Sequence, residues 1–481
     1  MDFGDNALIC IKVDSSKKFQ EYLGPYSRFG FFHPGPILFY FYGFLEFLVS
    51  PFNFFGSFHS KSSMYSYFQF LLNLLLLMSS YWLFPKEINK KLRILAIFVF
   101  LFFFENLDPK PLSNLFSIWG PYSIIIPFYV LLISSITLLY KSQYSLLPIL
   151  FLMNSIVISN HLSGTLYAGV YTFIVLLFVF KKSQNKKSFF FWLGISFLIF
   201  LVSFLPPIIE FFLYYPEDNI SKIFKITNST QSLRKGKEVF LYFFELISIF
   251  FTSIPNAGLG IGIAFVLLIF FLYFKRKFSN EYLKVVLFLA NLETGLVLIY
   301  IFKIPFDLLH YLNWFYVSVF VLYIFVIFNY LFLYLDKEIY KTILIILLGI
   351  GIALQIYIKS KIPKADFIKE HLVVEEIMKN FSFYQNHIYK IKWGYDDIHH
   401  QNWVLASGLI LKLQEKEIST CVDSNWVFMF GRNFLCPNPS VEKPIHTIYL
   451  KKNTERFLEP LVKKEKNTVN LYFFDYLIFV Q

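Results

Sequence analysis

The residues best suited to chemistry lie within the first 40 positions of the chain. Asp5 precedes a segment in which glycine and proline alternate with polar side chains, and this segment carries Arg28 and His33. A carboxylate can take a proton from an attacking hydroxyl group, and cations beside a helix N-terminus suit a phosphate. Because proline restricts the backbone, the segment predicts a rigid loop that leads into a helix at Pro36.

Two polar residues farther along the chain could contribute to the same chemistry. His161 follows an apolar run, and Glu210 lies near the end of another. Each candidate also has a purely structural interpretation. Asp5 could cap a helix, Arg28 could anchor in lipid headgroups, His33 could belong to a turn, and His161 and Glu210 could be satisfied residues at the ends of spans.

Membrane spans are expected to hold these residues in place. The chain has 481 residues, of which 56% are hydrophobic and 16% charged, and apolar runs of the length that crosses a bilayer recur along it. This pattern predicts an all-α polytopic membrane protein. We expect about ten spans, at 67–84, 93–106, 121–140, 145–160, 165–181, 189–212, 258–275, 282–303, 311–334 and 341–359.

Lysine clusters predict how these spans are oriented. The loops with Lys86 to Arg93, Lys141, Lys181 to Lys187, Lys275 to Lys277 and Lys337 to Lys341 all fall on one side, which the positive-inside rule makes cytoplasmic. Residues 1–66 and the C-terminal part then lie outside. Two more apolar stretches, 36–55 and 239–254, are expected to be interfacial or re-entrant. Two further full crossings are the alternative.

The composition changes after Ser360, where charged and polar residues return. A helical pattern at 367–381 and short β-like runs at 418–422 and 446–450 predict a small extracytoplasmic α/β domain over 361–481. The predicted domains are therefore 1–66, 67–360 and 361–481. Cys421 and Cys436 share the last of these, and they could form a disulfide if it faces an oxidising compartment.

Other polar groups indicate structural roles, or argue against a site for a nucleotide, a metal or nucleic acid. Asn291 and Glu293 lie midway along a predicted span, where packing or an interhelical hydrogen bond is expected. The glycines at 258, 260 and 262 follow no strand, so a nucleotide site is not expected. Residues 396–400 contain two aspartates and two histidines, which we expect to form a surface loop without metal. The net charge of +12 comes from clusters between spans, so nucleic acid is not an expected partner.

The N-terminal segment also resembles a known family. Residues 4–9 (GDNALI), 24–30 (GPYSRFG) and 33–40 (HPGPILFY) are similar to a stretch found in bacterial membrane glycosyltransferases of the GT-C type, including mannosyltransferase-like and arabinosyltransferase-like members. Weaker similarity follows at 160–162, 205–210, 216–219 and 311–314. The similar segments are thus spread over most of the predicted membrane part.

The resemblance implies a function for the whole chain. It implies transfer of a sugar from polyprenyl phosphate to an envelope glycan or lipid acceptor, outside the bacterial inner membrane, with Asp5 as general base. Arg28, His33, His161 and Glu210 would bind substrate or phosphate. No cofactor is implied; a divalent metal remains an alternative, although no residue pattern indicates one. The alternatives are a transporter or polymerase-type protein for lipid-linked glycans, and a non-catalytic relative that acts in envelope assembly.

Overall fold

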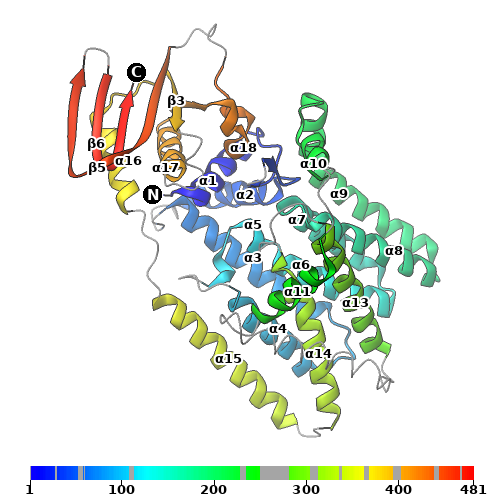
Figure 1. Cartoon of the computed structure of the whole chain (residues 1–481). Coiled ribbons are helices and arrows are strands. Elements are labelled where there is room, and N and C mark those ends of the chain that lie inside the picture. The colour runs from blue at the N-terminus through cyan, green and yellow to red at the C-terminus, as the bar shows by residue number, and fades with distance from the viewer. Residues whose placement is uncertain are drawn as a thin grey trace. The chain divides into compact units, whose positions relative to one another are not determined.

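A computed structural model describes residues 2–27, 30–52, 58, 60–107, 113–227, 234–249, 281–303, 313–334, 338–361, 368–393, 402–437, 444–465 and 468–480. The chain divides into two compact units (Figure 1). Unit 1 contains residues 1–32, 39–66 and 364–481, so it combines the two ends of the sequence, and unit 2 contains residues 33–38 and 67–363. The predicted span 258–275, Arg28, the glycines at 258–262 and residues 396–400 lie outside the described residues.

Unit 1 is a mixed α/β unit. Its helices are α1 (Gly4–Lys17), most of α2 (Ile37–Val49), η1 (Ser50–Phe52), the first turns of α3 (Lys61–Leu83), α16 (Ile368–Asn380), α17 (Asn402–Glu415), η8 (Ser424–Trp426), α18 (Val427–Phe430) and η9 (Arg432–Phe434). Its strands are β1 (Tyr26–Ser27), β2 (Phe31–Phe32), β3 (Ile388–Trp393), β4 (Ser419–Val422), β5 (Ile445–Glu465) and β6 (Thr468–Val480).

The four-stranded sheet of unit 1 has the order β4-β3-β5-β6. β3 pairs in parallel with β4 and with β5, whereas β5 and β6 form a long antiparallel hairpin. The parallel pair β3 and β4 is connected through α17, as the geometry of a βαβ unit requires. Cys421 of β4 and Cys436 form a disulfide. The expected C-terminal helix and the first expected strand are thus present as α16 and β4.

The start of the N-terminal segment differs from one expectation. Residues 4–9 were interpreted as part of a rigid loop, with a helix cap as the alternative for Asp5, but Gly4–Lys17 form the helix α1, with Asp5 in its first turn. The sequence from Asp5 to Leu23 contains neither glycine nor proline, and Ala7, Ile11 and Val13 are completely buried. α1 packs against α17, so burial of its apolar side chains stabilises a helix that local sequence only weakly favours.

Unit 2 is a helical bundle. It comprises most of α3, then α4 (Lys90–Glu105), η3 (Asn114–Phe116), α5 (Gly120–Ser123), α6 (Ile125–Lys141), η4 (Tyr144–Leu146), α7 (Leu147–Asn160), η5 (Thr165–Val170, a π-helical segment), α8 (Tyr171–Lys182), α9 (Lys186–Tyr214), α10 (Asn219–Thr227), α11 (Gly236–Ile249), α13 (Glu281–Lys303), α14 (Tyr316–Tyr334) and α15 (Glu338–Lys361).

Five helices of the described residues are long and apolar enough to cross a membrane: Gly120–Lys141, Thr165–Lys182, Lys186–Tyr214, Glu281–Lys303 and Ile339–Lys361. The first is buried along its whole apolar window, and the last is not buried at all in its window. A helix that is apolar on every side suits the centre of a bundle, whereas exposed apolar residues on outer helices suit contact with lipid. The described residues thus support a membrane protein.

Contacts between helices show which of them run in the same direction. Along α4 and α15, Lys91 Nζ donates a hydrogen bond to Thr342 Oγ1, and Gln355 donates one to Asn106. Both contacts advance in the same sense along the two sequences, so α4 and α15 are parallel neighbours (Figure 1). α13 and α14 are antiparallel, because Thr294 meets Tyr316 whereas the earlier Asn291 meets the later Tyr323.

Candidate functional site

Asp5 lies in the first turn of α1, where the helix dipole favours a carboxylate. Its side chain is half-buried, and its Oδ1 accepts a hydrogen bond of 2.7 Å from the Tyr26 hydroxyl group. Tyr26 belongs to β1, which pairs with β2 in a short hairpin. The chain therefore folds back so that two separate parts of the N-terminal motif segment meet at one carboxylate.

The N-terminus of α1 is fixed by α17. The amide of Gly4 donates to Ser407 Oγ at 2.9 Å. Gly408 allows close approach of Phe3, because a Cβ atom at Gly408 would lie 2.2 Å from the Phe3 ring. These contacts join residues more than 400 positions apart, and they position Asp5 from the C-terminal part of the chain.

His33 and His161 form a second polar group, in unit 2. Their rings stack with centroids 4.9 Å apart. The amide of Leu162 donates to His33 Nδ1 at 3.0 Å, so the proton of neutral His33 is on Nε2. His161 Nδ1 lies 2.5 Å from Ser163 Oγ. Two residues selected separately from the sequence are thus brought together.

Removal from water makes both histidines neutral at pH 7. Burial lowers the pKa of His161 to about 4. Burial, together with the neighbouring His161, lowers the pKa of His33 well below its usual value. The pair therefore offers neutral hydrogen-bonding groups rather than the cation expected at His33 from the sequence.

Two glycines hold the backbone around the histidine pair. The amide of Gly35 donates to the Ser159 carbonyl oxygen at 3.1 Å, and a Cβ atom at Gly35 would lie 2.6 Å from Ser159 Oγ. A Cβ atom at Gly164 would lie 2.7 Å from the Val157 carbonyl oxygen. Neither position has space for a side chain, so the glycines let the loop at 33–36 approach the end of α7.

Glu210 has a capping contact. It is 2% exposed, and its carboxylate accepts hydrogen bonds from the Asn219 amide at the start of α10. The adjacent Asp218 accepts from the amide and hydroxyl groups of Ser221. Burial opposes ionisation of Asp218, but these hydrogen bonds outweigh it and lower its pKa. The two acids satisfy a helix N-terminus, which favours a structural role for Glu210.

Sequence reasoning missed a buried amide network around Asn313. Its Oδ1 accepts from the Tyr167 hydroxyl group at 2.8 Å, and its Nδ2 donates to the Tyr242 hydroxyl oxygen at 3.0 Å. All three side chains are at most 4% exposed. Asn313 lies in the segment 311–314 of weaker family similarity, which did not indicate its partners, and no sequence pattern singled out the two tyrosines.

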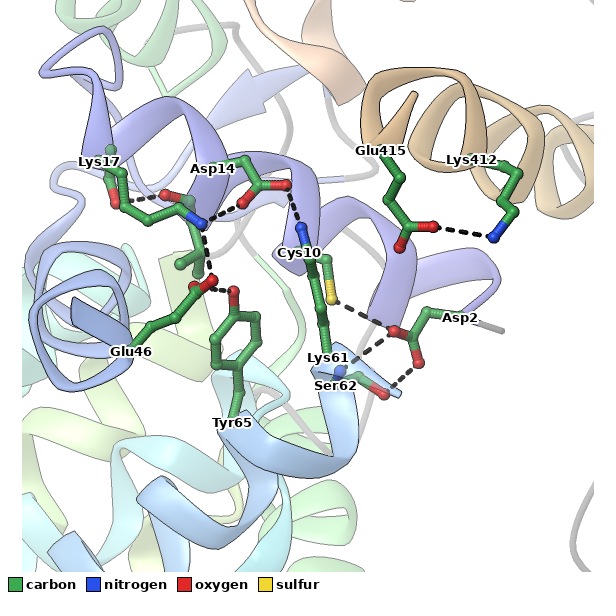
Figure 2. A network of polar contacts seen from close by, with 12 residues as sticks. Asp2, Cys10, Asp14, Lys17, Glu46, Lys61, Ser62, Tyr65, Lys412 and Glu415 are labelled. Carbon is green, nitrogen blue, oxygen red and sulfur yellow. Dashed lines mark hydrogen bonds and ion pairs between the residues drawn. The ribbon is translucent and has the colours of Figure 1, made fainter. Parts of the chain in front are cut away.

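A polar cleft of about 820 Å³ lies in unit 1, at the C-terminal ends of α1 and α17. Three lysines and three acids line it, together with several amide and hydroxyl side chains: Asp14, Ser15, Lys17, Lys18, Gln20, Lys61, Gln414, Glu415, Glu417, Ser419, Thr420 and Asn433. Asp14 is held between Lys17 and Lys61, at 2.5 and 2.9 Å (Figure 2). The lining therefore carries no excess of either charge.

The cleft and Asp5 occupy different positions on α1. Asp14 lies nine positions after Asp5, which corresponds to about 14 Å along a helix.

Among the described residues, no group of three histidine, cysteine, aspartate or glutamate side chains is arranged to hold a metal ion. In comparisons with known proteins, no family model, no curated protein and no solved structure matches the chain.

Proposed function

We propose that the chain is a GT-C-like membrane glycosyltransferase, which moves a sugar from polyprenyl phosphate to an envelope acceptor outside the bacterial inner membrane. The observation that carries the proposal is the hydrogen bond from Tyr26 to Asp5. It joins two of the three sequence segments that carry the family resemblance, and it leaves a half-buried carboxylate at the position that the resemblance assigns to the base.

The proposed reaction is a displacement at the anomeric carbon of the donor. The acceptor hydroxyl oxygen forms the new bond to this carbon, and its proton passes to the Asp5 carboxylate. The bond from the anomeric carbon to the phosphate oxygen breaks, and polyprenyl phosphate leaves with the bonding electrons. Hydrogen-bond donors near the leaving phosphate lower the barrier, and the family resemblance implies this role for His33 and His161.

An apolar groove in unit 2 supports a substrate with a long lipid chain. The groove has a volume of about 400 Å³, and it is lined by α11 and α13 with Lys303 at its edge: Gly236, Val239, Phe240, Leu298, Ile299, Phe302 and Lys303. Apolar side chains suit a prenyl chain, and an ammonium group suits a phosphate.

We also propose that ten spans place both ends of the chain outside. Parallel α4 and α15 and antiparallel α13 and α14 support this alternation of direction. The disulfide between Cys421 and Cys436 supports an oxidising compartment for the C-terminal part. A periplasm-only reporter fused after Gln481 should be active. A silent reporter, with activity of a cytoplasm-only reporter at the same position, would reverse the orientation.

The transferase proposal is tested by Asp5→Asn. The variant keeps the size of the side chain and its ability to accept from Tyr26, but it removes the base, so transfer should fall by at least about 100-fold. Transfer is measured in membranes supplied with radiolabelled polyprenyl-phosphate mannose or arabinose. The matched control is Asn6→Ala, an exposed neighbour on the same turn. Full activity of Asp5→Asn at normal membrane levels would defeat the assignment.

A transporter of lipid-linked glycans is the second candidate. It is favoured by Glu293, a completely buried carboxyl group midway along α13, because acids inside spans are typical of proton relays. A transporter would tolerate Asp5→Asn. Transfer activity in the wild-type protein that depends on Asp5 would therefore exclude transport as the sole function.

A further inference from the structure

Glu293 differs from the other polar residues at the centre of α13. Thr294 contacts the hydroxyl groups of Tyr316 and Tyr323 at 2.9 and 3.0 Å, and Asn291 accepts from Tyr323 at 2.8 Å. Glu293 is 0% exposed, and within the described residues neither of its carboxyl oxygens has a hydrogen-bond partner. It is thus a buried acid whose neighbours on the helix are satisfied.

Among the residues that the structure describes, the groups that face Glu293 carry no compensating positive charge. The side chains that interact electrostatically with it are Tyr167 of η5, Tyr171 of α8 and Tyr316 of α14. α6 and α11 also pack on α13, but no titratable group of either is among those that interact with Glu293 in the described part of the chain. As far as the described segments go, its surroundings are therefore aromatic and uncharged.

An ionised carboxylate is unstable in such surroundings. Moving a carboxylate from water into a protein interior costs several kcal/mol unless a cation or several donors compensate it. A protonated carboxyl group avoids most of this cost. We propose that Glu293 is a proton-binding site inside the helical bundle, which holds its proton at neutral pH. This inference is independent of the proposed transferase function.

A hydrophobic carbodiimide tests the site through its chemistry. The carboxyl proton passes to a carbodiimide nitrogen, and the carboxyl oxygen bonds to the central carbon. The O-acylisourea so formed then rearranges to a stable N-acylurea, and no group leaves. Only protonated carboxyl groups begin this sequence. An exposed glutamate with an ordinary pKa of about 4.3 is protonated in only about one molecule in 500 at pH 7.

The experiment treats the full chain in membranes with dicyclohexylcarbodiimide at pH 7, and peptide mass spectrometry locates the adduct. The matched control is Glu281 on the same helix, which is exposed and pairs with Lys284 at 2.6 Å. We expect at least about tenfold more adduct on Glu293 than on Glu281, and none at position 293 in Glu293→Gln. Equal modification of the two residues would overturn the proposal, as would protection of Glu293 by Na⁺, because Na⁺ would then be the ligand.

A second measurement does not depend on access of the reagent. The infrared difference spectrum between the wild-type protein and Glu293→Gln at pH 7 should contain the carbonyl band of a protonated carboxylic acid. Glutamine has nearly the same shape as the neutral acid, so the variant should fold. Carboxylate bands in place of the acid band would show that Glu293 is ionised, and the proposal would fail.

Discussion

At the scale of single residues, the histidine pair gives the protein a defined acid sensitivity. The folded state holds His33 and His161 neutral, whereas an unfolded histidine binds a proton below a pH of about 6.5. The unfolded state then binds more protons than the folded state, so stability falls as the pH drops below this value. For His161, the interval extends to a pH of about 4.

We predict that His161→Gln reduces this acid sensitivity. A folded pKa of about 4 against an unfolded value of about 6.5 corresponds to roughly 3 kcal/mol of unfolding free energy. When the pH is lowered from 7 to 4, the unfolding free energy of the wild-type protein should therefore fall by up to roughly 3 kcal/mol more than that of the variant. Chemical unfolding in detergent across this pH range measures the difference.

The comparison variant is His371→Gln, because His371 on α16 is only half-buried and faces Glu375 at 3.3 Å. This variant should reduce the acid sensitivity less than His161→Gln does, because His161 is 3% exposed. Parallel pH profiles for the wild-type protein and His161→Gln would contradict the assigned burial of the imidazole.

The sequence was sufficient to select candidate residues, but it did not reveal their partners. Asp5, His33, His161 and Glu210 were all selected for their type and position. Asp5 accepts a hydrogen bond from Tyr26, which is 21 positions away. His33 accepts one from the amide of Leu162, and Glu210 accepts one from the amide of Asn219. Such contacts depend on how the chain folds back on itself, and no local pattern in a single sequence encodes that.

At the scale of elements, the parallel pair α4 and α15 depends on close contact between helices. A Cβ atom at Gly351 would lie 3.1 Å from the Phe102 ring, and one at Gly349 would lie 3.2 Å from the Phe98 ring. The buried ion pair between Lys359 and Glu105, at 3.1 Å, joins the C-terminal ends of the same helices. Small residues at such interfaces are typical of membrane helices.

We predict that Gly351→Leu weakens the attachment of α15 to α4. The added side chain has to displace Phe102, and overpacking of this kind costs about 1–3 kcal/mol. The matched control is Gly295→Leu on α13, where a Cβ atom would meet no atom of the described residues within 4 Å. In mixed micelles, Gly351→Leu should have a lower free energy of unfolding than Gly295→Leu. Equal free energies of unfolding would argue against the close contact between α15 and α4.

Hydrophobic patterns predicted elements better than they predicted their limits. The apolar runs at 189–212 and 282–303 correspond to α9 and α13, and the helical pattern at 367–381 corresponds to α16. The second predicted strand, 446–450, is in fact β5, which extends to Glu465. Its later residues alternate little between polar and apolar, so the pairing with β6 rather than the local pattern determines its length.

At the scale of the whole molecule, unit 1 joins the beginning and the end of the sequence. The expected division into 1–66, 67–360 and 361–481 treated these ends as separate, because composition changes along the chain and says nothing of long-range contact. The amide of Gly4 donating to Ser407 is one such contact. Composition along the chain does not indicate long-range contacts of this kind.

We predict that the disulfide stabilises unit 1. Fifteen residues separate Cys421 from Cys436, and closing a loop of this size stabilises by about 3 kcal/mol. Cys421→Ser with Cys436→Ser should therefore lower the unfolding midpoint of the chain. In unfolded, unreduced wild-type protein, a thiol reagent should label only Cys10, which is free and buried in the folded state. Labelling of all three cysteines without reduction would contradict the pairing.

The assembly of unit 1 from both ends of the chain has a consequence for biosynthesis. About 300 residues separate its two parts. A ribosome that adds about 5–20 residues per second needs on the order of 15–60 seconds to synthesise these intervening residues. During that delay α1 lacks α17, against which it packs in the folded protein. The nascent protein therefore carries an exposed apolar helix for most of its synthesis, and it is a natural client for a chaperone or for the membrane surface itself.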